Sequence, residues 1–214
     1  MSFFTKFPAM ERADLRDLKK GIDSSFKEFS RSWGESIEAF FDPLFYFLVR
    51  FEKLLLATPW PIIILIVAAL SYLGSRSWKL SLGAAVSFLL IGYLGMWNNT
   101  MSTVALISVA TIICIAFGIP IGIAMSRSER LQAIITPVLD IMQTIPIFVY
   151  LLPVVMLLGI GKVPGLIAVC VYAMPPIVRL TNLGLRLVDK EILEAADAFG
   201  SNYRQRLFNV QLPL

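Results

Sequence analysis

The sequence predicts an all-α integral membrane protein with about five transmembrane helices after an amphipathic N-terminal helix. Of its 214 residues, 57% are hydrophobic and only 16% are charged, whereas a soluble domain is about half apolar and a quarter charged. The mean hydropathy is +0.75. Beyond Lys53 the chain contains long runs without any charged residue, and the run 80–126 spans 47 residues. A transmembrane β-strand would alternate over about 10 residues, so these continuously apolar runs favour helices.

A membrane-spanning helix needs about 20 apolar residues to cross a hydrocarbon core about 30 Å thick. The 47-residue run must therefore hold two spans, and the polar residues 97–100 are the expected turn between them. The expected spans are residues 59–73, 78–96, 101–125, 134–159 and 163–180.

Charge in the connecting segments predicts the orientation. One set of loops carries Arg76 with Lys79, Arg127 with Arg130, and the basic residues of 179–206, whereas the opposite set carries only Lys162. Cytoplasmic loops are enriched in Lys and Arg. We therefore expect the N-terminus outside and residues 181–214 in the cytoplasm.

Residues 1–56 are expected to form a separate N-terminal region, before two first spans in 57–100 and a transmembrane core in 101–214. Residues 1–35 are polar and are expected to be a mobile or weakly helical tail. Apolar residues at helical spacing over 40–55 indicate an amphipathic helix on the membrane surface. A scaffold brace is one interpretation of this helix, and binding a partner or sensing the membrane is the other.

The end of the chain has a helix–turn–helix pattern. Asp189, Glu191 and Glu194 precede or open a helix, where carboxylates suit the positive end of the helix dipole. Gly200 is expected to end that helix in a left-handed turn, and Ser201 to cap the next one. Such an element could fit a groove on a partner or be a plain connector.

This pattern resembles the EAA loop of bacterial ABC-importer permeases. The resemblance rests on a spaced motif in 189–214, with Val210 where the family usually has Ile; the other motif residues are Glu194, Ala195, Ala196, Gly200, Leu212 and Pro213. It implies that the loop is the coupling helix that docks onto a cytoplasmic ATPase subunit. These six residues and Asp197 are the expected coupling residues.

Three further stretches, in 139–153, 159–165 and 175–181, resemble the glycine betaine/proline betaine (quaternary amine, ProW-type) permeases, and the resemblance covers residues 40–214. It implies a type I ABC-importer fold, apparently truncated after the EAA loop, because family members continue with about two more helices. It also implies a multi-pass protein of the bacterial inner membrane.

The resemblance implies several partners: cytoplasmic ABC ATPase subunits, an extracytoplasmic substrate-binding protein, a second permease copy in a homodimer, and the lipid bilayer. No nucleic acid is expected. The sequence has no Gly-rich Lys-Ser/Thr loop and no histidine, so we expect neither an enzyme nor a resident cofactor or metal. ATP and Mg would belong to the partner ATPase.

Residues 140–153 are the candidate translocation pathway. Asp140 is a carboxylate within an apolar segment, where a charge at mid-bilayer costs roughly 2.5–3.5 kcal/mol. It could line a pathway or gate, or pair with Arg127 or Arg130 at the interface. Polar residues and helix-breaking prolines follow Asp140. They could line a water-filled cavity or kink a helix for packing. The further pathway candidates are Gln143, Thr144, Pro146, Tyr150 and Pro153.

The predicted function is therefore that of a permease subunit for glycine betaine-like compatible solutes, driven by ATP hydrolysis on another subunit. A permease for choline, carnitine or an amino acid is the first alternative. An ion-coupled carrier is disfavoured because such carriers often bury several charges at the midplane, and here Asp140 is the one candidate. A channel or scaffold would not need the EAA spacing.

Overall fold

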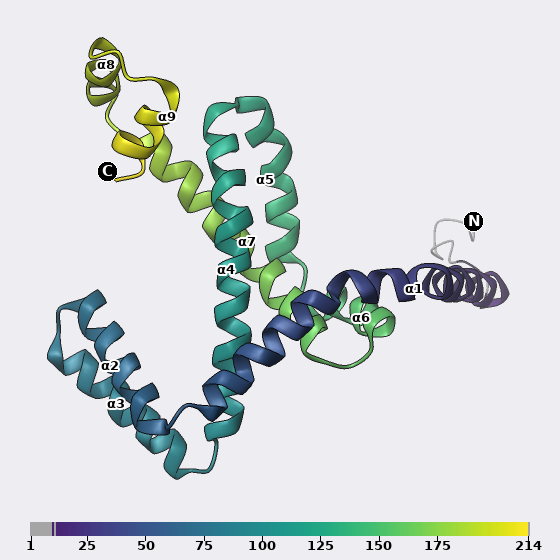
Figure 1. The fold of residues 1–214 in the computed structure, drawn as a ribbon. Helices are drawn as coiled ribbons and strands as arrows, with labels where there is room; N and C mark the ends of the chain where they lie inside the picture. Colours follow the sequence, from purple (N-terminus) through teal and green to yellow (C-terminus); the bar gives the residue numbers. More distant parts are fainter. Residues whose placement is uncertain (1–9, 11, 214) are drawn as a thin grey trace, which may run out of the picture.

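The computed structural model describes residue 10 and residues 12–213, and all regular structure in this part of the chain is helical (Figure 1). The all-α prediction is confirmed. Residues 1–9 and 11 of the expected tail, and Leu214 of the expected loop, lie outside the described residues. The helices are α1 (Arg12–Ala57), α2 (Trp60–Ser75), α3 (Trp78–Tyr93), α4 (Trp97–Arg127), α5 (Glu129–Thr144), α6 (Ile147–Leu158), α7 (Lys162–Leu187), α8 (Lys190–Ala198), α9 (Tyr203–Gln205) and a π-helix (Arg206–Gln211).

Two helices, α4 and α7, are each long and apolar enough to cross a membrane. Two bent pairs, α1 with α2 at 105° and α5 with α6 at 87°, could each contribute one more crossing. Helix α3 is apolar but has 16 residues, or about 24 Å at 1.5 Å per residue. The described chain thus offers two to four crossings by length and composition, against about five expected.

The expected fourth span, residues 134–159, is wrong as one continuous helix. Helix α5 ends at Thr144, and Ile145 has an extended backbone with φ −74° and ψ 126°. The cause is Pro146, because a proline disfavours helical geometry in the residue before it. Pro146 becomes the N-cap of α6, while Pro153 lies inside α6. The two prolines therefore do not share a helix with Asp140.

The centre of the fold is the crossing of α4 and α7, where two glycines of α4 face α7. A Cβ on Gly118 would lie 2.8 Å from Cγ2 of Ile177, and one on Gly122 would lie 2.8 Å from the backbone oxygen of Val178. Small residues let membrane helices approach closely. Next to this contact Met125, Leu139 and Val178 form a buried apolar cluster that joins α5 to the pair.

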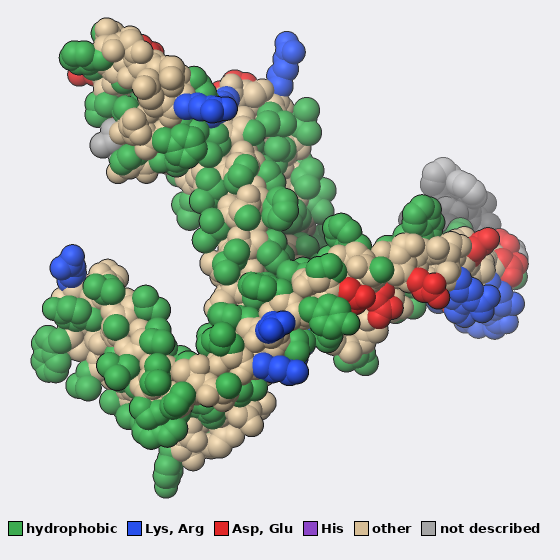
Figure 2. Space-filling model, viewed as in Figure 1, with side chains coloured by type: hydrophobic (Ala, Val, Ile, Leu, Met, Phe, Trp, Pro, Cys, Tyr) green, Lys and Arg blue, Asp and Glu red, His purple; other side chains and the backbone are tan. Residues whose placement is uncertain are grey.

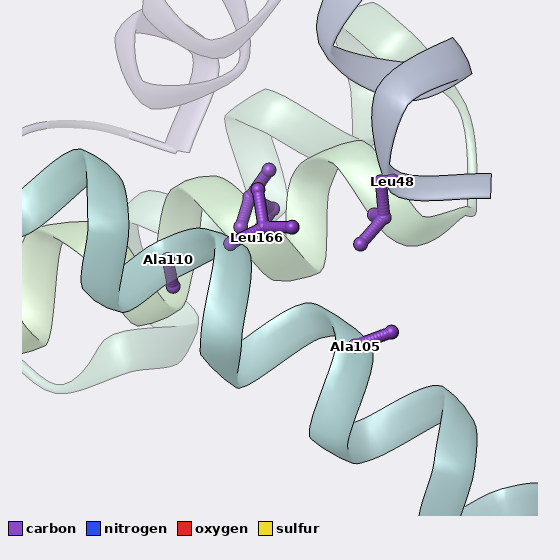
Figure 3. Close-up of a cluster of buried hydrophobic side chains, with 5 residues drawn as sticks. Leu48, Ala105, Ala110 and Leu166 are labelled. Carbon is purple, nitrogen blue, oxygen red and sulfur yellow. The ribbon is translucent and has the colours of Figure 1, made fainter. Parts of the chain in front are cut away.

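Helix α1 is one helix of 46 residues, so the tail expected over 1–35 is helical from Arg12. Its last third packs against the helix pair: Leu48 is 1% exposed and lies with Ala105, Ala110 and Leu166 in a second apolar cluster (Figure 3). Part of the surface that the sequence assigns to the membrane over 40–55 therefore packs against protein from Leu44 onward, whereas Phe47 and Leu54 stay exposed. Apolar periodicity predicts which face of a helix is removed from water, but it does not tell whether lipid or protein covers that face.

An ion pair with a nearly buried carboxylate joins this end of α1 to α7. The Glu52 side chain is 10% exposed and pairs with the ammonium of Lys162 at the start of α7. The Ser102 hydroxyl of α4 donates to the second carboxylate oxygen of Glu52 at 2.6 Å. One carboxylate thus joins three helices.

We expect Lys162→Met to lower the free energy of unfolding more than the double variant Glu52→Gln/Lys162→Met. Removing one partner of a fully buried pair costs about 3–5 kcal/mol, because the other charge stays buried without compensation. Lys162 is 40% exposed, so the cost here should fall below that range. Thermal unfolding of the purified variants would measure it. Equal losses in the two variants would mean that the pair does not carry this stability.

Candidate functional site: the C-terminal loop and the α5–α6 bend

The first half of the C-terminal loop (residues 189–213) is helix α8, with a defined cap at each end. The Asp189 carboxylate accepts a hydrogen bond from the Glu191 amide at 3.0 Å. At the other end the Gly200 amide donates to Asp197 O at 2.9 Å and the Ser201 amide to Ala196 O at 3.1 Å, which is the Schellman pattern. Gly200 has φ +75°. The predicted left-handed turn at Gly200 is confirmed.

The second half of the loop begins with a different cap from the one expected. Asn202, not Ser201, caps α9: its side chain accepts from the Gln205 amide at 3.0 Å, and the Gln205 side chain accepts from the Asn202 amide at 2.9 Å. The two bonds form a capping box. Ser201 instead completes the turn that ends α8, so the second helix starts one residue later.

Two contacts and one buried side chain hold the second half of the loop. The guanidinium of Arg127, the last residue of α4, lies 3.8 Å from the centre of the Tyr203 ring, a cation–π distance. Arg206 and Asp197 form an ion pair at 2.9 Å that joins the two halves. Leu207 is buried. The second half of the loop thus contacts the end of α4 and holds α8 through Arg206.

The chain then returns toward the crossing of the two long helices. Gln211 and Leu212 line a cavity of about 200 Å³ together with Ile119 of α4 and residues of α7 that include Leu180 and Leu185. Pro213 follows directly and is exposed. A movement of the loop would therefore change its packing against α4 and α7.

Helix α8 itself has no buried residue. Glu194, Ala195 and Asp197 are exposed, Ala196 is half-buried, and Phe199 is 92% exposed. In Figure 1, α8 stands beside α9 at the far end of α7, away from α1 to α3. Helix α8 is therefore exposed on a loop that is held through its other half.

The α5–α6 bend gathers part of the predicted pathway. Asp140 pairs with Arg179 of α7, not with Arg127 or Arg130 as expected. The reason is geometric: Asp140 lies three turns along α5 from the α4–α5 turn, at the level of the middle of α7. The Thr144 hydroxyl donates to Asp140 O at 2.9 Å.

The other pathway candidates lie around the same bend. Gln143 is exposed on α5, Tyr150 is half-buried on α6, and its hydroxyl has no hydrogen-bond partner within the described part of the chain. With Pro146 at the break and Pro153 in α6, these residues fall on two helices at 87° rather than along one.

Sequence reasoning missed the residues that hold the loop and the bend. Arg179, which pairs with Asp140, was assigned to a basic loop without a partner, and Arg127, which contacts Tyr203, was considered as a partner of Asp140 only. Arg186 likewise pairs with Glu129 of α5 at 2.5 Å and donates to Met125 O at 3.1 Å. The sequence did contain a signal for the ion pairs: α5 carries carboxylates and α7 carries arginines, and the two segments were expected to lie close together in the membrane. Among the described residues no group of three or more His, Cys, Asp or Glu could hold a metal ion.

The fold and this loop define a multi-pass helical membrane protein with a short, exposed helix presented at one end of α4 and α7, the two helices that are each long and apolar enough to cross a membrane. Residues 114–214 match the family described as binding-protein-dependent transport system inner membrane component. The matched segment runs from the middle of α4 through the C-terminal loop.

Three similar proteins are permeases for betaines. The glycine betaine/proline betaine transport system permease protein ProW of Escherichia coli (strain K12) is 46% identical over 177 residues, 80% of this chain and 48% of that protein. The glycine betaine transport system permease protein OpuAB of Bacillus subtilis (strain 168) is 50% identical over 135 residues, 63% of this chain and 48% of that protein. The glycine betaine/carnitine transport permease protein GbuB of Listeria monocytogenes serotype 1/2a (strain 10403S) is 45% identical over 161 residues, 74% of this chain and 57% of that protein.

The chain spans about half the length of these curated relatives. The predicted resemblance to betaine-type permeases of the inner membrane is confirmed.

Proposed function

We propose that the chain is part of the permease subunit of an ABC importer for glycine betaine, proline betaine and similar compatible solutes. The observation that carries this is the C-terminal loop, in which α8 is exposed while the second half of the loop is attached to α4 and lies against α7. The 45–50% identity to three betaine permeases supports the substrate class.

In this proposal the protein is a transport subunit without catalytic or nucleotide-binding motifs, and ATP and Mg are held by two cytoplasmic ATPase subunits. Closure of the ATPase pair would push on α8, with the pushed surface formed by Glu194, Ala195, Ala196, Asp197 and Gly200. The Asp197–Arg206 pair would pass the movement to the second half of the loop, and the contacts of Tyr203 and Leu212 would pass it to the α4–α7 crossing. This is coupling between distinct sites through rigid elements.

The remaining partners follow from the same proposal. An extracytoplasmic binding protein would deliver the solute, and a second copy of the permease would provide the other half of the path in a homodimer. The N-terminus would lie outside and the loop 189–214 inside the cell. The three regions 1–56, 57–100 and 101–214 would then be an N-terminal arm, a peripheral hairpin and the transport core.

Uptake of radiolabelled glycine betaine by cells that express the full protein with its ATPase and binding protein tests the proposal. We expect saturable uptake that unlabelled proline betaine competes away. Uptake of choline or carnitine in preference to betaine would favour the first alternative, a permease for another amine. Uptake that persists without the ATPase would favour an ion-coupled carrier.

We further propose that Asp140, Gln143, Thr144, Pro146, Tyr150 and Pro153 line the translocation path. The Asp140–Arg179 pair at the bend supports this, because a carboxylate in an apolar segment is costly and marks a functional position in many membrane proteins. If the pair were purely structural, exchanging the acidic and the basic residue should preserve its role. If Asp140 lines the path, the exchange should impair transport.

We expect Asp140→Arg to prevent folding or uptake, because it places two guanidinium groups together in an apolar segment. The swap Asp140→Arg/Arg179→Asp restores opposite charges, so it should restore the amount of folded protein in the membrane but not uptake. Immunoblotting of membranes and radiolabelled uptake measure the two effects separately. Full uptake by the swapped variant would reduce the pair to a structural brace.

A further inference from the structure

Helix α1 carries an apolar repeat of eleven residues along almost its whole length. From Leu15 to Leu55, apolar side chains recur at steps of 3, 4 and 4 residues without interruption; they are Leu15, Leu18, Ile22, Phe26, Phe29, Trp33, Ile37, Phe40, Leu44, Leu48, Phe51 and Leu55. At 100° per residue these twelve positions fall within one sector of about 120° on the helix. We call this set the α1 stripe.

The α1 stripe packs against protein over its last third and is mostly exposed before it, where only Phe26 and Ile37 are half-buried. Leu44, Leu48, Phe51 and Leu55 belong to the cluster with α4 and α7. In the first two thirds, Ile22 is 61% exposed, Trp33 is 58% exposed and Phe40 is 76% exposed. Figure 1 shows this part of α1 running away from the helix pair, with no other labelled helix beside its N-terminal half.

The covered end places α1 at one surface of the membrane. Glu52 contacts Ser102 near the start of α4 and Lys162 at the start of α7, and these are the two helices best suited to cross the bilayer. The rest of α1 cannot enter the hydrocarbon core, because residues 12–42 carry thirteen charged side chains and each would cost roughly 2.5–3.5 kcal/mol there. Figure 2 shows these charges gathered on α1, whereas hydrophobic side chains dominate the visible faces of α2, α3 and α4.

We propose that residues 12–40 lie flat on the membrane surface, with the α1 stripe inserted between lipid headgroups and the charged sectors in water. Phe and Trp on one face, charges on the other and low overall hydrophobicity are the features of an interfacial helix. The stripe continues directly from the covered contacts with membrane helices, so the bilayer is the apolar medium that this face meets next. This part of α1 includes residues 12–35, which were expected to be a polar tail because of their average composition. The proposal does not depend on the substrate.

Spin labels on neighbouring positions of the two faces test this in the full protein, reconstituted into vesicles of phosphatidylethanolamine and phosphatidylglycerol. Single cysteines would replace Phe29 and Trp33 on the stripe, and Glu28 and Arg31 on the polar faces, in a background with Cys114→Ala and Cys170→Ala. Oxygen, which concentrates in lipid, and a water-soluble nickel chelate would then be compared as relaxing agents. The matched positions share the same turns of α1, so their differences report the face and not the location along the helix.

We expect labels at positions 29 and 33 to be relaxed several-fold more by oxygen than by the nickel chelate, and labels at 28 and 31 to show the reverse. Stripe labels shielded from both agents would mean that protein, such as the α1 of a second copy, covers the stripe. Stripe labels relaxed mainly by the chelate would mean that the stripe lies in water. Either result would overturn the proposal, and neither depends on whether the protein transports betaine.

Discussion

Replacement of Gly200 by valine should weaken the association of the permease with its ATPase by about 5- to 30-fold while leaving membrane insertion intact. Gly200 has φ +75°, and a left-handed backbone costs a residue with a Cβ roughly 1–2 kcal/mol, with β-branched residues the least suited. The amides of Gly200 and Ser201 close the end of α8, so relief of the strain would re-aim the helix. Retention of the ATPase on the immobilised, detergent-extracted permease measures the effect.

Gly200→Asn is the matched control, because asparagine tolerates the left-handed region. No heavy atom lies within 4 Å of a Cβ built on Gly200, so size alone should not matter, and the asparagine variant should retain most of the ATPase. If valine and asparagine behave alike, the backbone of this turn does not govern docking. Glu194→Lys should also leave insertion intact and separate ATP hydrolysis from uptake, and normal uptake by this variant would argue against a coupling role for α8.

Gly122→Ala should lower the free energy of unfolding by about 1–3 kcal/mol, the usual cost of an overpacked core. A Cβ at this position would lie 2.6 Å from Cβ of Thr181 and 2.8 Å from the backbone oxygen of Val178. Backbone cannot rotate aside, so α4 and α7 would have to separate along their main contact. Thermal unfolding of the purified protein, followed by tryptophan fluorescence, measures the loss.

Alanine substitutions of two other glycines serve as comparisons for the loss of stability expected at Gly122. Gly118→Ala should cost less than Gly122→Ala, because its nearest neighbour is the Cγ2 methyl of Ile177 at 2.8 Å and no backbone atom is among the three nearest. Gly184→Ala, on α7 with nothing within 4 Å, should be neutral or stabilise by up to ~1 kcal/mol through helix propensity. A loss at Gly184 equal to that at Gly122 would contradict the packing explanation.

Local signals in the sequence predicted much of the fold. Charge-free apolar runs located α2, α3, α4 and α7, because continuous apolar content predicts membrane helices. The turn expected at residues 97–100 was wrong: these residues are the first turn of α4, and the break lies at residues 94–96. Gly200 was predicted to end α8 from its type and spacing, and its positive φ confirms this. The break at Pro146 was also readable, since the residue before a proline avoids helical geometry; the long apolar run obscured it.

Two kinds of feature could not be predicted in the same way. The long helix α1 was missed over residues 12–35 because the average polarity of that segment hides an eleven-residue repeat. The contacts of Asp140 with Arg179, Arg127 with Tyr203 and Glu52 with Lys162 join residues far apart in the chain. They depend on which helices cross and at what level, and hydropathy does not contain that information.

Site-specific photo-crosslinking from Phe199 is the most direct test of the central claim, that the exposed α8 end of the C-terminal loop docks onto an ATPase. Phe199 is 92% exposed at the end of α8, whereas Phe117 is 61% exposed on the apolar helix α4. A photoreactive phenylalanine analogue at position 199 of the full protein should form a crosslink to the co-expressed ATPase in native membranes, and one at position 117 should not. If position 199 gives no crosslink, or both positions crosslink equally, the loop is not the docking element and the proposed coupling route is wrong.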